Sequence, residues 1–365
     1  MTIYHIISNK VWGGGEQYAF DLCRRLQADG HRVVVVCRPV DTITTRMKQA
    51  GIEVHTLPLK GVADVRSAKK LAAIVGKEPC VVHVHNFKDA FTACYARLFN
   101  HNGAMSVVVT RHLVRHAKTS LPYRWLYRHV DRVVFVSHVA MDSFLATNPT
   151  IDKAKLCVVL NSISLPESTQ AEDLHSMFAI DADMVVAMYH GRIAPEKGLI
   201  TLINALTMKH SLPLHLVIIG SGDETYTAFL KEKIKTKRLE GRVHLIGFRP
   251  NVFSYIRGAD FGVVPSIVPE SSSLACMEYM SQGKCVITTT GGGQQEYITS
   301  GINGMLVPPA DSHALADALS MMTNDAAMRR NMGKAASDYF QSHLNYDIFY
   351  KKIVEVYTNL RSSTY

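Results

Sequence analysis

Two carboxylates stand eight residues apart in the stretch PESSSLACMEYM, late in the chain. Glu270 precedes three serines, and Glu278 lies within the apolar run that follows them. Serine hydroxyls accept hydrogen bonds from free backbone amides, so residues 271–273 predict the start of a helix. The first amides of that helix, near Ser273 and Leu274, are suited to an anion such as a diphosphate. A carboxylate can accept from two neighbouring hydroxyls, which suits Glu278 to a ribose diol and Glu270 to a sugar.

Two cations stand in an earlier loop, HGRIAPEKG, which follows a predicted strand. Arg192 and Lys197 come before Gly198 and an apolar helical stretch. Charge-assisted hydrogen bonds to phosphate contribute about 1.5–3 kcal/mol each, which offsets the repulsion that two carboxylates would exert on a diphosphate. On its own this loop would be interpreted as a surface turn. Together with the two carboxylates it predicts a phosphate site.

The elements that must position these residues are strands and helices in alternation. Apolar runs such as HRVVVVCR (31–38), MSVVVT (105–110) and LHLVIIG (214–220) alternate with amphipathic stretches. Continuous apolar strands between helices predict parallel sheets that are covered on both faces. The pattern restarts with DMVVAMYHGR at residue 183, and the polar stretch 161–175 is predicted to be the linker.

We therefore expect a first α/β domain over residues 1–165 and a second over 166–345. The stretch NYDIFYKKIVEVYTNL has apolar residues near helical spacing, so residues 346–365 are expected to form a closing helix that packs back on the first domain. Two doubly wound domains in tandem place a ligand in the cleft between them, at the carboxyl ends of both sheets.

The bulk composition supports this organisation. A chain of 365 residues with 47% hydrophobic and 19% charged residues is typical of two globular domains. Its seven cysteines are scattered and never form a CxxC pair, which favours reduced thiols over a disulfide framework or a zinc site. The polar start MTIYHIISNK is unlike a signal peptide, and no apolar run of membrane-spanning length occurs. We expect a cytoplasmic protein, and consider peripheral attachment at the inner face of a membrane.

The ordered motifs of the chain resemble those of GT-B glycosyltransferases of the large retaining family 4, the glycosyltransferase group 1 type. The resemblance rests on GGGEQYAFDLCRRLQADGHRVVVV (13–36), VVHVHN (81–86), VVVTRH (107–112), GRIAPEKG (191–198), IIGSG (218–222), LIGF (245–248) and the Glu270–Glu278 pair. Each motif is weak alone, but the ordered set is specific. It implies an α/β GT-B fold in which two Rossmann-like, doubly wound parallel-sheet domains face a central cleft.

The resemblance also implies roles for single residues. Glu270 and Glu278 match the family's E-x7-E pair, in which the first glutamate contacts the donor sugar and the second holds the ribose. Arg192 and Lys197 match the pair that binds the donor diphosphate, and His112 matches the histidine near the reacting sugar. The predicted catalytic set is therefore His112, Arg192, Lys197 and Glu270. The predicted donor site further includes Gly14, Gly15, Gly247, Phe248, Ser273, Leu274 and Glu278.

One departure from the family concerns the donor pocket. The family commonly has Glu-Gly-Phe-Gly after the first glutamate, whereas this chain has Glu270-Ser-Ser-Ser. Ser273, in place of the second glycine, still allows the backbone to approach closely, but the missing aromatic residue and glycine bear on which sugar is held. The resemblance implies a metal-independent reaction with no cofactor, in which a nucleoside-diphosphate sugar is the donor substrate.

The positive charge is concentrated in the first half. Residues 1–165 hold 22 Lys and Arg against 11 Asp and Glu. Within RHLVRHAKTSLPYRWLYRHVDR (111–132) aromatic residues stand between cations, which is typical of a membrane interface or a site for a phosphorylated acceptor. A helix packed by its aromatic residues, with basic residues outward, is the alternative; nucleic acid is not expected. The residues predicted to contact the acceptor or an anionic membrane are Arg111, Arg115, Lys118, Arg124, Trp125 and Arg128.

Three other patterns are considered as sites. GSGDET (220–225) follows a strand like a dinucleotide fingerprint but lacks its third glycine. Asp181-x-Asp183 resembles the metal signature of the other glycosyltransferase fold, but it precedes the first strand of the second domain and favours a solvated turn. His83 and His85 share one face of a strand; with no third ligand evident, a polar strand end is favoured over a metal pair.

These observations favour a retaining glycosyltransferase that moves a sugar from a nucleotide donor to a glycan or lipid-linked acceptor, in the synthesis of bacterial-type surface polysaccharide or glycolipid. Two alternatives stay open within the same fold: a nucleotide-sugar epimerase and a non-catalytic nucleotide-sugar-binding subunit. An epimerase would turn over the donor without an acceptor, and a binding subunit would bind it without turnover. The basic stretch 111–132 favours a true acceptor.

Overall fold

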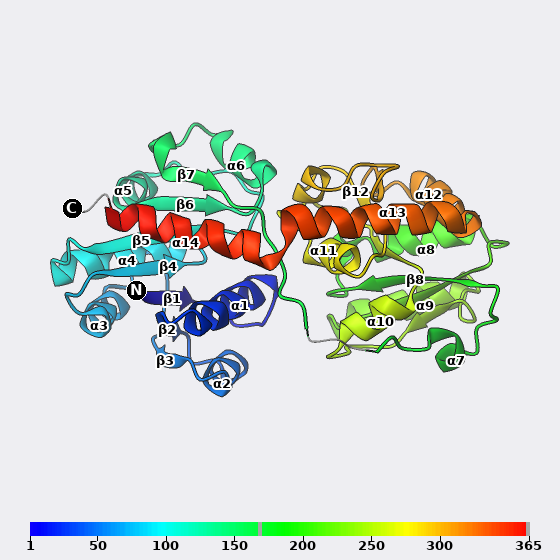
Figure 1. The fold of residues 1–365 in the computed structure, drawn as a ribbon, viewed down its shortest axis with the longest axis horizontal. Coiled ribbons are helices and arrows are strands. Elements are labelled where there is room, and N and C mark those ends of the chain that lie inside the picture. The colour runs from blue at the N-terminus through cyan, green and yellow to red at the C-terminus, as the bar shows by residue number, and fades with distance from the viewer. Residues whose placement is uncertain (167–169, 363–365) are drawn as a thin grey trace. The chain divides into compact units, whose positions relative to one another are not determined.

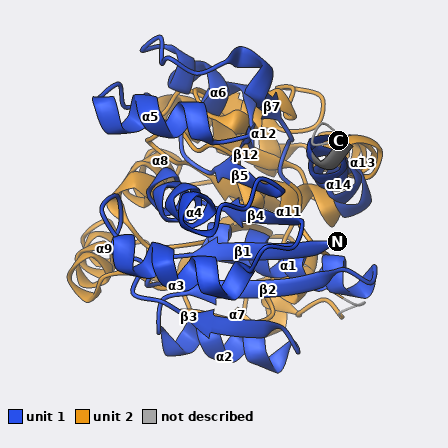
Figure 2. Ribbon diagram, turned by 90° about the vertical axis from the view of Figure 1, so that its left-hand side faces the viewer, with its two compact units in different colours: residues 1–161, 346–365 blue, residues 162–345 orange. Residues whose placement is uncertain are grey.

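The computed structural model describes residues 1–166 and 170–362 and divides the chain into two compact units (Figure 1, Figure 2). Unit 1 comprises residues 1–161 and 346–365, and unit 2 comprises residues 162–345. The change of unit falls at the start of the expected linker, just before the expected boundary after residue 165. Residues 167–169 of that linker and residues 363–365 of the expected closing helix lie outside the described residues.

Unit 1 is built on a seven-stranded parallel sheet with the strand order β3-β2-β1-β4-β5-β6-β7. The strands are β1 (Thr2–Ile7), β2 (Arg32–Cys37), β3 (Glu53–Thr56), β4 (Cys80–Val84), β5 (Met105–Arg111), β6 (Arg132–Phe135) and β7 (Leu156–Val158). The sheet forms because its central strands are runs of β-branched residues that are buried on both faces, as in β2, where every residue after Arg32 is buried.

Helices cover both faces of this sheet (Figure 1). They are α1 (Gly14–Ala28), α2 (Asp41–Gln49), α3 (Val65–Val75), α4 (Phe87–Asn100), α5 (Leu121–His129), α6 (His138–Leu145), the short 3-10 turn η1 (Lys153–Lys155) and the C-terminal α14 (Tyr346–Ser362). Side-chain caps define several helix starts: Asp64 accepts from the backbone N–H of Ser67 at α3, and Asn86 accepts from that of Asp89 at α4. α14 packs its apolar face into a core shared with α1, β1 and β2.

Unit 2 has a six-stranded parallel sheet with the order β10-β9-β8-β11-β12-β13. Its strands are β8 (Val185–His190), β9 (Leu214–Ile219), β10 (Val243–Leu245), β11 (Phe261–Val264), β12 (Val286–Thr289) and β13 (Met305–Val307). The helices are α7 (Leu174–Phe178), α8 (Leu199–Met208), α9 (Glu224–Thr236), α10 (Val252–Gly258), α11 (Leu274–Ser281), α12 (Ser312–Asn324) and α13 (Ala326–Tyr339). Short turns complete the unit: η2 (Pro195–Lys197), η3 (Gly293–Glu296) and the π-helical η4 (Phe340–Leu344).

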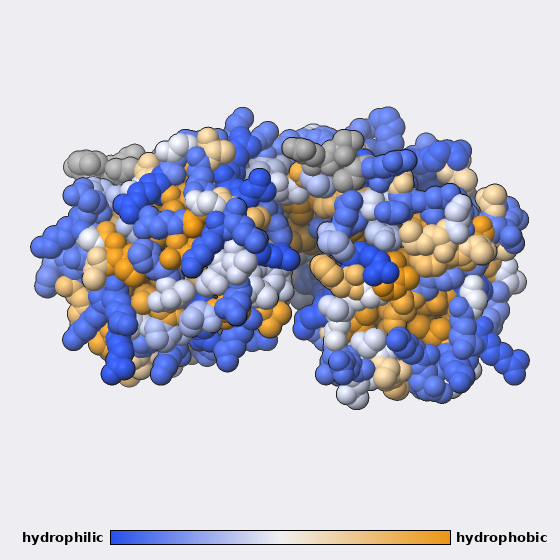
Figure 3. All heavy atoms as spheres, turned by 90° about the horizontal axis from the view of Figure 1, so that it is seen from below, coloured by the Kyte–Doolittle hydropathy of each residue, from blue (hydrophilic) through white to orange (hydrophobic). Residues whose placement is uncertain are grey.

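Each unit has its own apolar core, and the surface is otherwise mixed. Figure 3 shows one face on which apolar side chains lie in areas interrupted by hydrophilic ones. Six of the seven cysteines are buried and Cys157 is half-buried, and all seven are free thiols. Among the described residues, no helix combines the length and the apolar composition that crossing a bilayer requires.

Candidate functional site

The strand orders predict where each unit binds a ligand. In an open parallel sheet, the crevice lies at the carboxyl ends of the strands where the order reverses. In unit 2 this point lies between β8 and β11, and in unit 1 between β1 and β4. Arg192 and Lys197 follow β8, while Glu270 follows β11. The topology therefore brings together, within unit 2, the residues predicted to form the donor site.

Lys197 and Glu270 form an ion pair at this point. Lys197 Nζ lies 2.7 Å from Glu270 Oε1, and the Ser266 hydroxyl donates to the same carboxylate oxygen. The two charged side chains are only 23% and 14% exposed. Burial acts to raise the pKa of the Glu270 carboxyl, but the charge and hydrogen bond of Lys197, with the hydroxyl of Ser266, hold this pKa below its ordinary value. Glu270 is therefore an ionised carboxylate that is paired with the ammonium group of Lys197.

The backbone around Gly198 holds Lys197 in place. Gly198 has a φ of 70°, and a Cβ atom there would lie 1.9 Å from the carbonyl oxygen of Pro265. The N–H of Ile267 also donates to the carbonyl of Glu196 at 2.9 Å. The loop after β8 is thus fastened to the chain that leaves β11, which is why a glycine follows the lysine.

Arg192 lies on the same loop but has a different environment. Its guanidinium pairs with Glu196 at 2.6 Å, and its side chain is 66% exposed. Tyr189 donates its hydroxyl to the Arg192 carbonyl at 2.7 Å, which fixes the backbone while the side chain reaches into solvent. Arg192 is therefore an exposed cation near the site, not a partner of the buried carboxylates.

The start of α11 differs from the expected N-cap. Ser273 occupies the N-cap position, but its side chain makes no capping hydrogen bond. Its hydroxyl, like that of Ser272, is buried, and it does not accept from an amide at the start of the helix. Ser273 is 1% exposed and Tyr297 donates to its carbonyl at 3.0 Å, so its side chain is turned inward. The helix therefore begins where the three serines predict, but the expected capping hydrogen bond is missing. Among the described residues, the Ser273 hydroxyl does not cap the first-turn amides near Leu274.

The triple glycine of the chain packs against Glu270. The N–H of Gly293 donates to the Glu270 carbonyl at 2.7 Å, and a Cβ atom on Gly292 would lie 2.8 Å from the same oxygen. The glycines thus let a neighbouring loop approach the backbone at Glu270. These glycines therefore support the backbone of the site.

Glu278 has a partner, His190, that was not among the predicted site residues. Its Oε2 contacts Nε2 of His190, the last residue of β8, and the other ring nitrogen of His190 lies 3.0 Å from the hydroxyl of Tyr279. Tyr279 in turn donates to the Met188 carbonyl at 2.7 Å. The available signal was a histidine at the end of an apolar strand, directly before the GR of the cation loop. Glu278 thus lies on the inner side of α11, against β8.

Gly247 and Phe248 line a cavity of unit 2. It has a volume of about 370 Å³ and is lined by the segments after β8, β9 and β10 and by α9, with Ile193, Gly222 and Lys231 among its other residues. Phe248 is 63% exposed at this cavity. Cβ atoms on Gly220 and Gly222 would lie 1.8 Å from the carbonyl oxygens of Gly191 and Ile193. The GSG sequence therefore serves close packing of two loops, as its missing third glycine suggested.

In unit 1, the glycine loop lies beside His112. Gly14 begins α1, and a Cβ atom on Gly15 would lie 3.9 Å from Cδ2 of His112. The Glu16 carboxylate accepts from the Gly13 N–H at 3.0 Å and from the Asn9 side chain, which closes the loop. Gly15 and His112 are thus neighbours at the switch point of this sheet, although 97 residues of sequence separate them.

His112 is the outer member of a group of four histidines. His112 Nε2 lies 3.4 Å from His85 Nδ1, and His85 Nε2 lies 3.1 Å from His5 Nδ1. His5 is paired with His83 in the sheet register. Burial lowers the pKa of His112 to about 4 and that of His5 to about 3, so these rings are neutral near pH 7. A neutral His112 can donate or accept one hydrogen bond without adding charge.

The expectation that His83 and His85 lack a third ligand is wrong, because His5 lies beside them. One ring nitrogen from each of the three lies within 4.8 Å of the others. However, both nitrogens of His83 are already hydrogen-bonded, to the hydroxyls of Tyr357 and Thr110, each at 2.6 Å. A metal needs a free nitrogen lone pair. The geometry therefore fits a hydrogen-bonded group better than a ligand set. His83 is buried within β4, whereas His85 is half-buried and directly follows the end of this strand.

Asp181 and Asp183 are exposed in the turn before β8, as the solvated-turn interpretation expected. Among the described residues, neither belongs to a group of three potential metal ligands.

The basic stretch of unit 1 divides into inward and outward residues. The Arg111 guanidinium lies over the rings of Phe87 and Phe144, 5.4 and 5.2 Å from their centroids, and Trp125 stacks on His129 at 4.2 Å. Both pack into the protein, unlike the outward orientation expected of acceptor or membrane contacts. The exposed basic residues are Arg115, Lys118, Arg124 and Arg128. The exposed basic face therefore contains four of the six residues that were predicted to contact the acceptor or a membrane.

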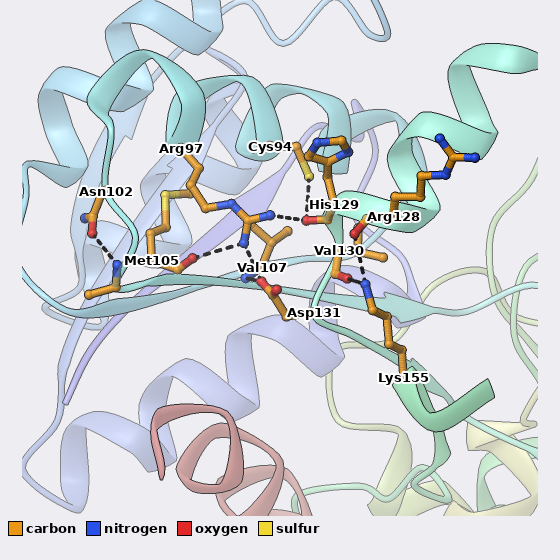
Figure 4. Close-up of polar contacts among 11 residues, drawn as sticks. Cys94, Arg97, Asn102, Met105, Val107, Arg128, His129, Val130, Asp131 and Lys155 are labelled. Carbon is orange, nitrogen blue, oxygen red and sulfur yellow. Dashed lines mark hydrogen bonds and ion pairs between the residues drawn. The ribbon is translucent and has the colours of Figure 1, made fainter. Parts of the chain in front are cut away.

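Part-buried and exposed polar contacts hold the end of α5 that carries this face. Arg97 pairs with Asp131 at 2.6 Å and donates to the His129 carbonyl, while Lys155 donates to the carbonyls of Arg128 and Val130 at 2.9 and 2.8 Å. Figure 4 shows that the Arg128 side chain extends away from these contacts. Arg97 and Lys155 therefore fix the backbone of this segment, while the Arg128 side chain makes none of these contacts.

Comparison with known proteins identifies both units. Residues 170–339 match the family of glycosyl transferases group 1, and residues 13–162 match the glycosyl transferase 4-like domain. The alpha-D-kanosaminyltransferase of Streptomyces kanamyceticus is 25% identical over 293 residues, 75% of each chain. The lipopolysaccharide 1,2-N-acetylglucosaminetransferase of Salmonella typhimurium is 26% identical over 183 residues, 47% of this chain and 48% of that one.

The fold is shared with solved structures. Anabaena Alr3699/HepE, solved in complex with UDP, superposes with a TM-score of 0.84 at 19% identity, over 98% of this chain and 100% of that one. This likeness, with the two helix-covered parallel sheets, confirms the predicted GT-B fold of two Rossmann-like domains.

Proposed function

Because the chain belongs to the glycosyl transferases group 1 and is a glycosyltransferase, we propose that it transfers a sugar, with retention of configuration, from a nucleoside-diphosphate sugar to a glycan or lipid-linked acceptor. We further propose that the product is a bacterial-type surface polysaccharide or glycolipid, made on the cytoplasmic side of a membrane. The UDP bound by Anabaena Alr3699/HepE and the lipopolysaccharide named for the Salmonella relative support the donor class and the product class.

The Lys197–Glu270 pair at the start of α11 is the observation that carries this proposal. Lys197 is a half-buried cation, and the adjacent first turn of α11 has no capping hydroxyl. A cation beside free helix amides is suited to the diphosphate of the donor. The two side chains are already ordered against each other before any donor is bound, so little reorganisation is needed at the moment of reaction.

In the proposed reaction, the bond between the sugar anomeric carbon and the diphosphate oxygen breaks. Lys197, the α11 amides and the exposed Arg192 stabilise the negative charge that develops on the departing nucleoside diphosphate. The acceptor hydroxyl forms the new bond on the face that the diphosphate leaves, and its proton passes to the leaving phosphate oxygen. His112, neutral because of its burial, orients the sugar, and Glu278 holds the ribose. No metal ion is required in this scheme.

The donor is tested with a thermal-shift panel of UDP, GDP, ADP and their sugars, repeated with a chelator. A ligand at 100 times its Kd adds about 2.7 kcal/mol to the free energy of unfolding, which raises the midpoint by a few degrees. We expect one nucleotide class to raise it equally with and without chelator. A midpoint unchanged by every nucleotide would overturn the donor assignment, and a shift lost with the chelator would overturn metal independence.

Lys197→Ala tests the cation directly. We expect turnover to fall about 10²–10³-fold, because one preorganised charge that faces the leaving group is lost. This variant also leaves Glu270 buried without its cation, which destabilises the fold. The double variant Lys197→Ala/Glu270→Gln removes that unpaired charge, and should regain stability without regaining turnover.

The matched control is Lys334→Ala, which breaks an exposed ion pair with Asp338 in the same unit. Its turnover should equal that of the unchanged protein, because an exposed pair contributes little. Near-normal turnover of Lys197→Ala would contradict the proposed role of this lysine.

We also propose that the exposed basic face of unit 1 binds the anionic surface that presents a lipid-linked acceptor. The face consists of Arg115, Lys118, Arg124 and Arg128, with the exposed apolar side chains of Leu113 and Leu121 nearby in sequence. Each basic residue near such a surface contributes about 1 kcal/mol. Replacing the four basic residues by Gln should abolish sedimentation with phosphatidylserine vesicles at low salt. Replacing four exposed cations of unit 2, Lys231, Lys233, Lys235 and Lys237, is the control.

A further inference from the structure

Hydrogen-bond geometry fixes where the protons lie around Glu278. The Tyr279 hydroxyl oxygen is 2.7 Å from the Met188 carbonyl oxygen. A carbonyl oxygen can only accept, so the single hydroxyl proton of Tyr279 must lie in this contact. Burial raises the pKa of Tyr279 well above its ordinary value, and the hydroxyl therefore keeps that proton.

The same hydroxyl determines the state of His190. Its oxygen is 3.0 Å from His190 Nδ1, and because its own proton points to Met188, it accepts here. His190 Nδ1 therefore carries a hydrogen. The other nitrogen, Nε2, contacts Glu278 Oε2. A neutral ring with its hydrogen on Nδ1 has only a lone pair at Nε2, and a lone pair against a carboxylate is repulsive. The Nε2–Oε2 contact must hold a second proton.

We propose that His190 and Glu278 share one proton, and that the resulting neutral pair is the form of the site that binds the nucleoside diphosphate. The proton lies either on the ring, as an imidazolium facing a carboxylate, or on the carboxyl group, facing a neutral ring. The net charge of the pair is zero in both cases. His190 is then a positioning residue, which acts on the donor through Glu278. This inference rests on the proposed function, in which Glu278 holds the ribose of the donor.

The charges around the pair determine how the shared proton affects the affinity for the diphosphate. On either side of the pair, Tyr189 on β8 and Cys276 and Tyr279 on α11 are neutral, because burial raises the pKa of each. Among the described residues of the site, the charged side chains Lys197 and Arg192 are paired with Glu270 and Glu196. When the shared proton leaves, Glu278 adds one uncompensated negative charge beside the place proposed for the diphosphate.

The sign of the pH dependence follows. The diphosphate binds the protonated pair better than the deprotonated one, so its affinity falls as the pH rises through the range in which the proton leaves. Since one proton is linked to binding, the fall is at most about tenfold per pH unit. Glu270 contributes no such dependence near neutral pH, because its pKa is held below its ordinary value.

The first test is calorimetric binding of UDP-, GDP- and ADP-glucose to the full chain between about pH 6 and about pH 9. The diphosphate of these sugar nucleotides keeps a constant charge over this range, whereas a free nucleoside diphosphate has a terminal phosphate that loses a proton at about pH 6. For the diphosphate that binds, Kd should rise with pH in the unchanged protein. His190→Gln keeps an N–H toward Glu278 but cannot hold the extra proton. Its Kd should be about tenfold higher at the low end of the range and should not change with pH.

The control is His215→Gln. His215 is a partly buried histidine of β9 in the same unit, hydrogen-bonded to His244 at 3.1 Å. It lies near the start of its strand, whereas His190 ends β8. The Kd of the His215→Gln variant and its change with pH should match those of the unchanged protein. A pH-independent Kd in the unchanged protein, or the same profile in His190→Gln, overturns the shared proton.

Two further measurements separate this inference from the proposed function. Imidazole ¹⁵N NMR of the free protein, with His190→Gln for assignment, should show His190 Nδ1 protonated throughout; a ring protonated only at Nε2 overturns the inference without any donor. If no diphosphate binds, the proposed function fails while this spectrum still tests the proton. In a Glu278→Gln background, His190→Gln should add less than about a twofold loss of affinity. Fully additive losses would overturn the positioning role.

Discussion

Neighbouring charge decides the ionisation of the buried carboxylates in this chain. Glu270 and Asp89 are both largely removed from water, which by itself raises the pKa of a carboxyl group. Glu270 has the ammonium group of Lys197 at 2.7 Å, and its pKa lies below the ordinary value. Asp89 is 1% exposed and has chiefly the neutral donors Ser8 and Asn86, so burial raises its pKa to about 6.

Asp89→Asn should therefore stabilise the protein at neutral pH. Because the folded-state pKa of Asp89 is raised, the unfolded chain binds fewer protons between about pH 4 and about pH 6, and stability falls as the pH rises through that window. Ionisation of Asp89 therefore lowers the free energy of unfolding near pH 7 by about 3 kcal/mol. Asparagine can still accept from Asn86 and Ser8 through its amide oxygen. Urea unfolding at about pH 4 and about pH 7 measures the difference.

The exposed Asp142 of the same unit gives the control for this prediction. Asp142→Asn should leave the free energy of unfolding within about 0.5 kcal/mol at both pH values. The prediction is contradicted if the free energy of unfolding changes with pH by the same amount in Asp89→Asn and in the unchanged protein. Ionisation of Asp89 would then not destabilise the folded state.

At the scale of elements, loops rather than strands set the geometry of the donor residues. The segment after β8 has to bring Lys197 close to Glu270 and then begin α8 at once. It does so by placing Gly198 at a φ of 70° with its backbone against Pro265. The precision of the ion pair therefore depends on a residue that carries no charge.

Gly198→Ala should weaken both the fold and donor binding. A residue other than glycine at this φ costs about 1–2 kcal/mol, and the new Cβ would lie 1.9 Å from the Pro265 carbonyl oxygen, so the loop must shift. We expect a loss of more than about 2 kcal/mol, seen as a lower thermal midpoint, and a weaker nucleoside diphosphate Kd. Gly241→Ala is the control, because a Cβ there meets no atom within 4 Å. An unshifted midpoint in Gly198→Ala would show that the loop is free to move.

The elements also show what the sequence could and could not predict. The central strands were predictable because each is a continuous run of apolar, largely β-branched residues. The edge strands β3 and β13 were missed; Glu53–Thr56 carries polar residues and Met305–Val307 has only three residues, so neither shows a clear period. Lys197, Glu270 and Glu278 were found through motif spacing. Their contacts with Ser266 and His190 were not, since His190 and Glu278 are 88 residues apart and meet only when β8 and α11 pack together.

At the scale of the whole molecule, the chain finishes in the unit in which it begins. α14 places Phe349, Tyr350, Ile353 and Tyr357, all between 0% and 5% exposed, in the core of unit 1. Unit 2 is formed by one continuous segment, residues 162–345. Unit 1 therefore completes its core only with α14, whereas the described core of unit 2 is made of residues from its own segment.

Tyr357→Ala should therefore destabilise unit 1 selectively. The ring is fully buried, and its hydroxyl bonds His83 at 2.6 Å, so its loss should cost about 3–5 kcal/mol. Hydrogen exchange should become faster in β1 and β4 and stay unchanged in β8 and β11. Tyr357→Phe removes only the hydroxyl and leaves His83 Nδ1 unpaired, which should cost about 1–3 kcal/mol. Lys351→Ala, an exposed residue of the same helix, should change neither unit. Equal acceleration of exchange in both sheets would show that the two cores unfold as one, and would contradict the independence inferred from their separate packing.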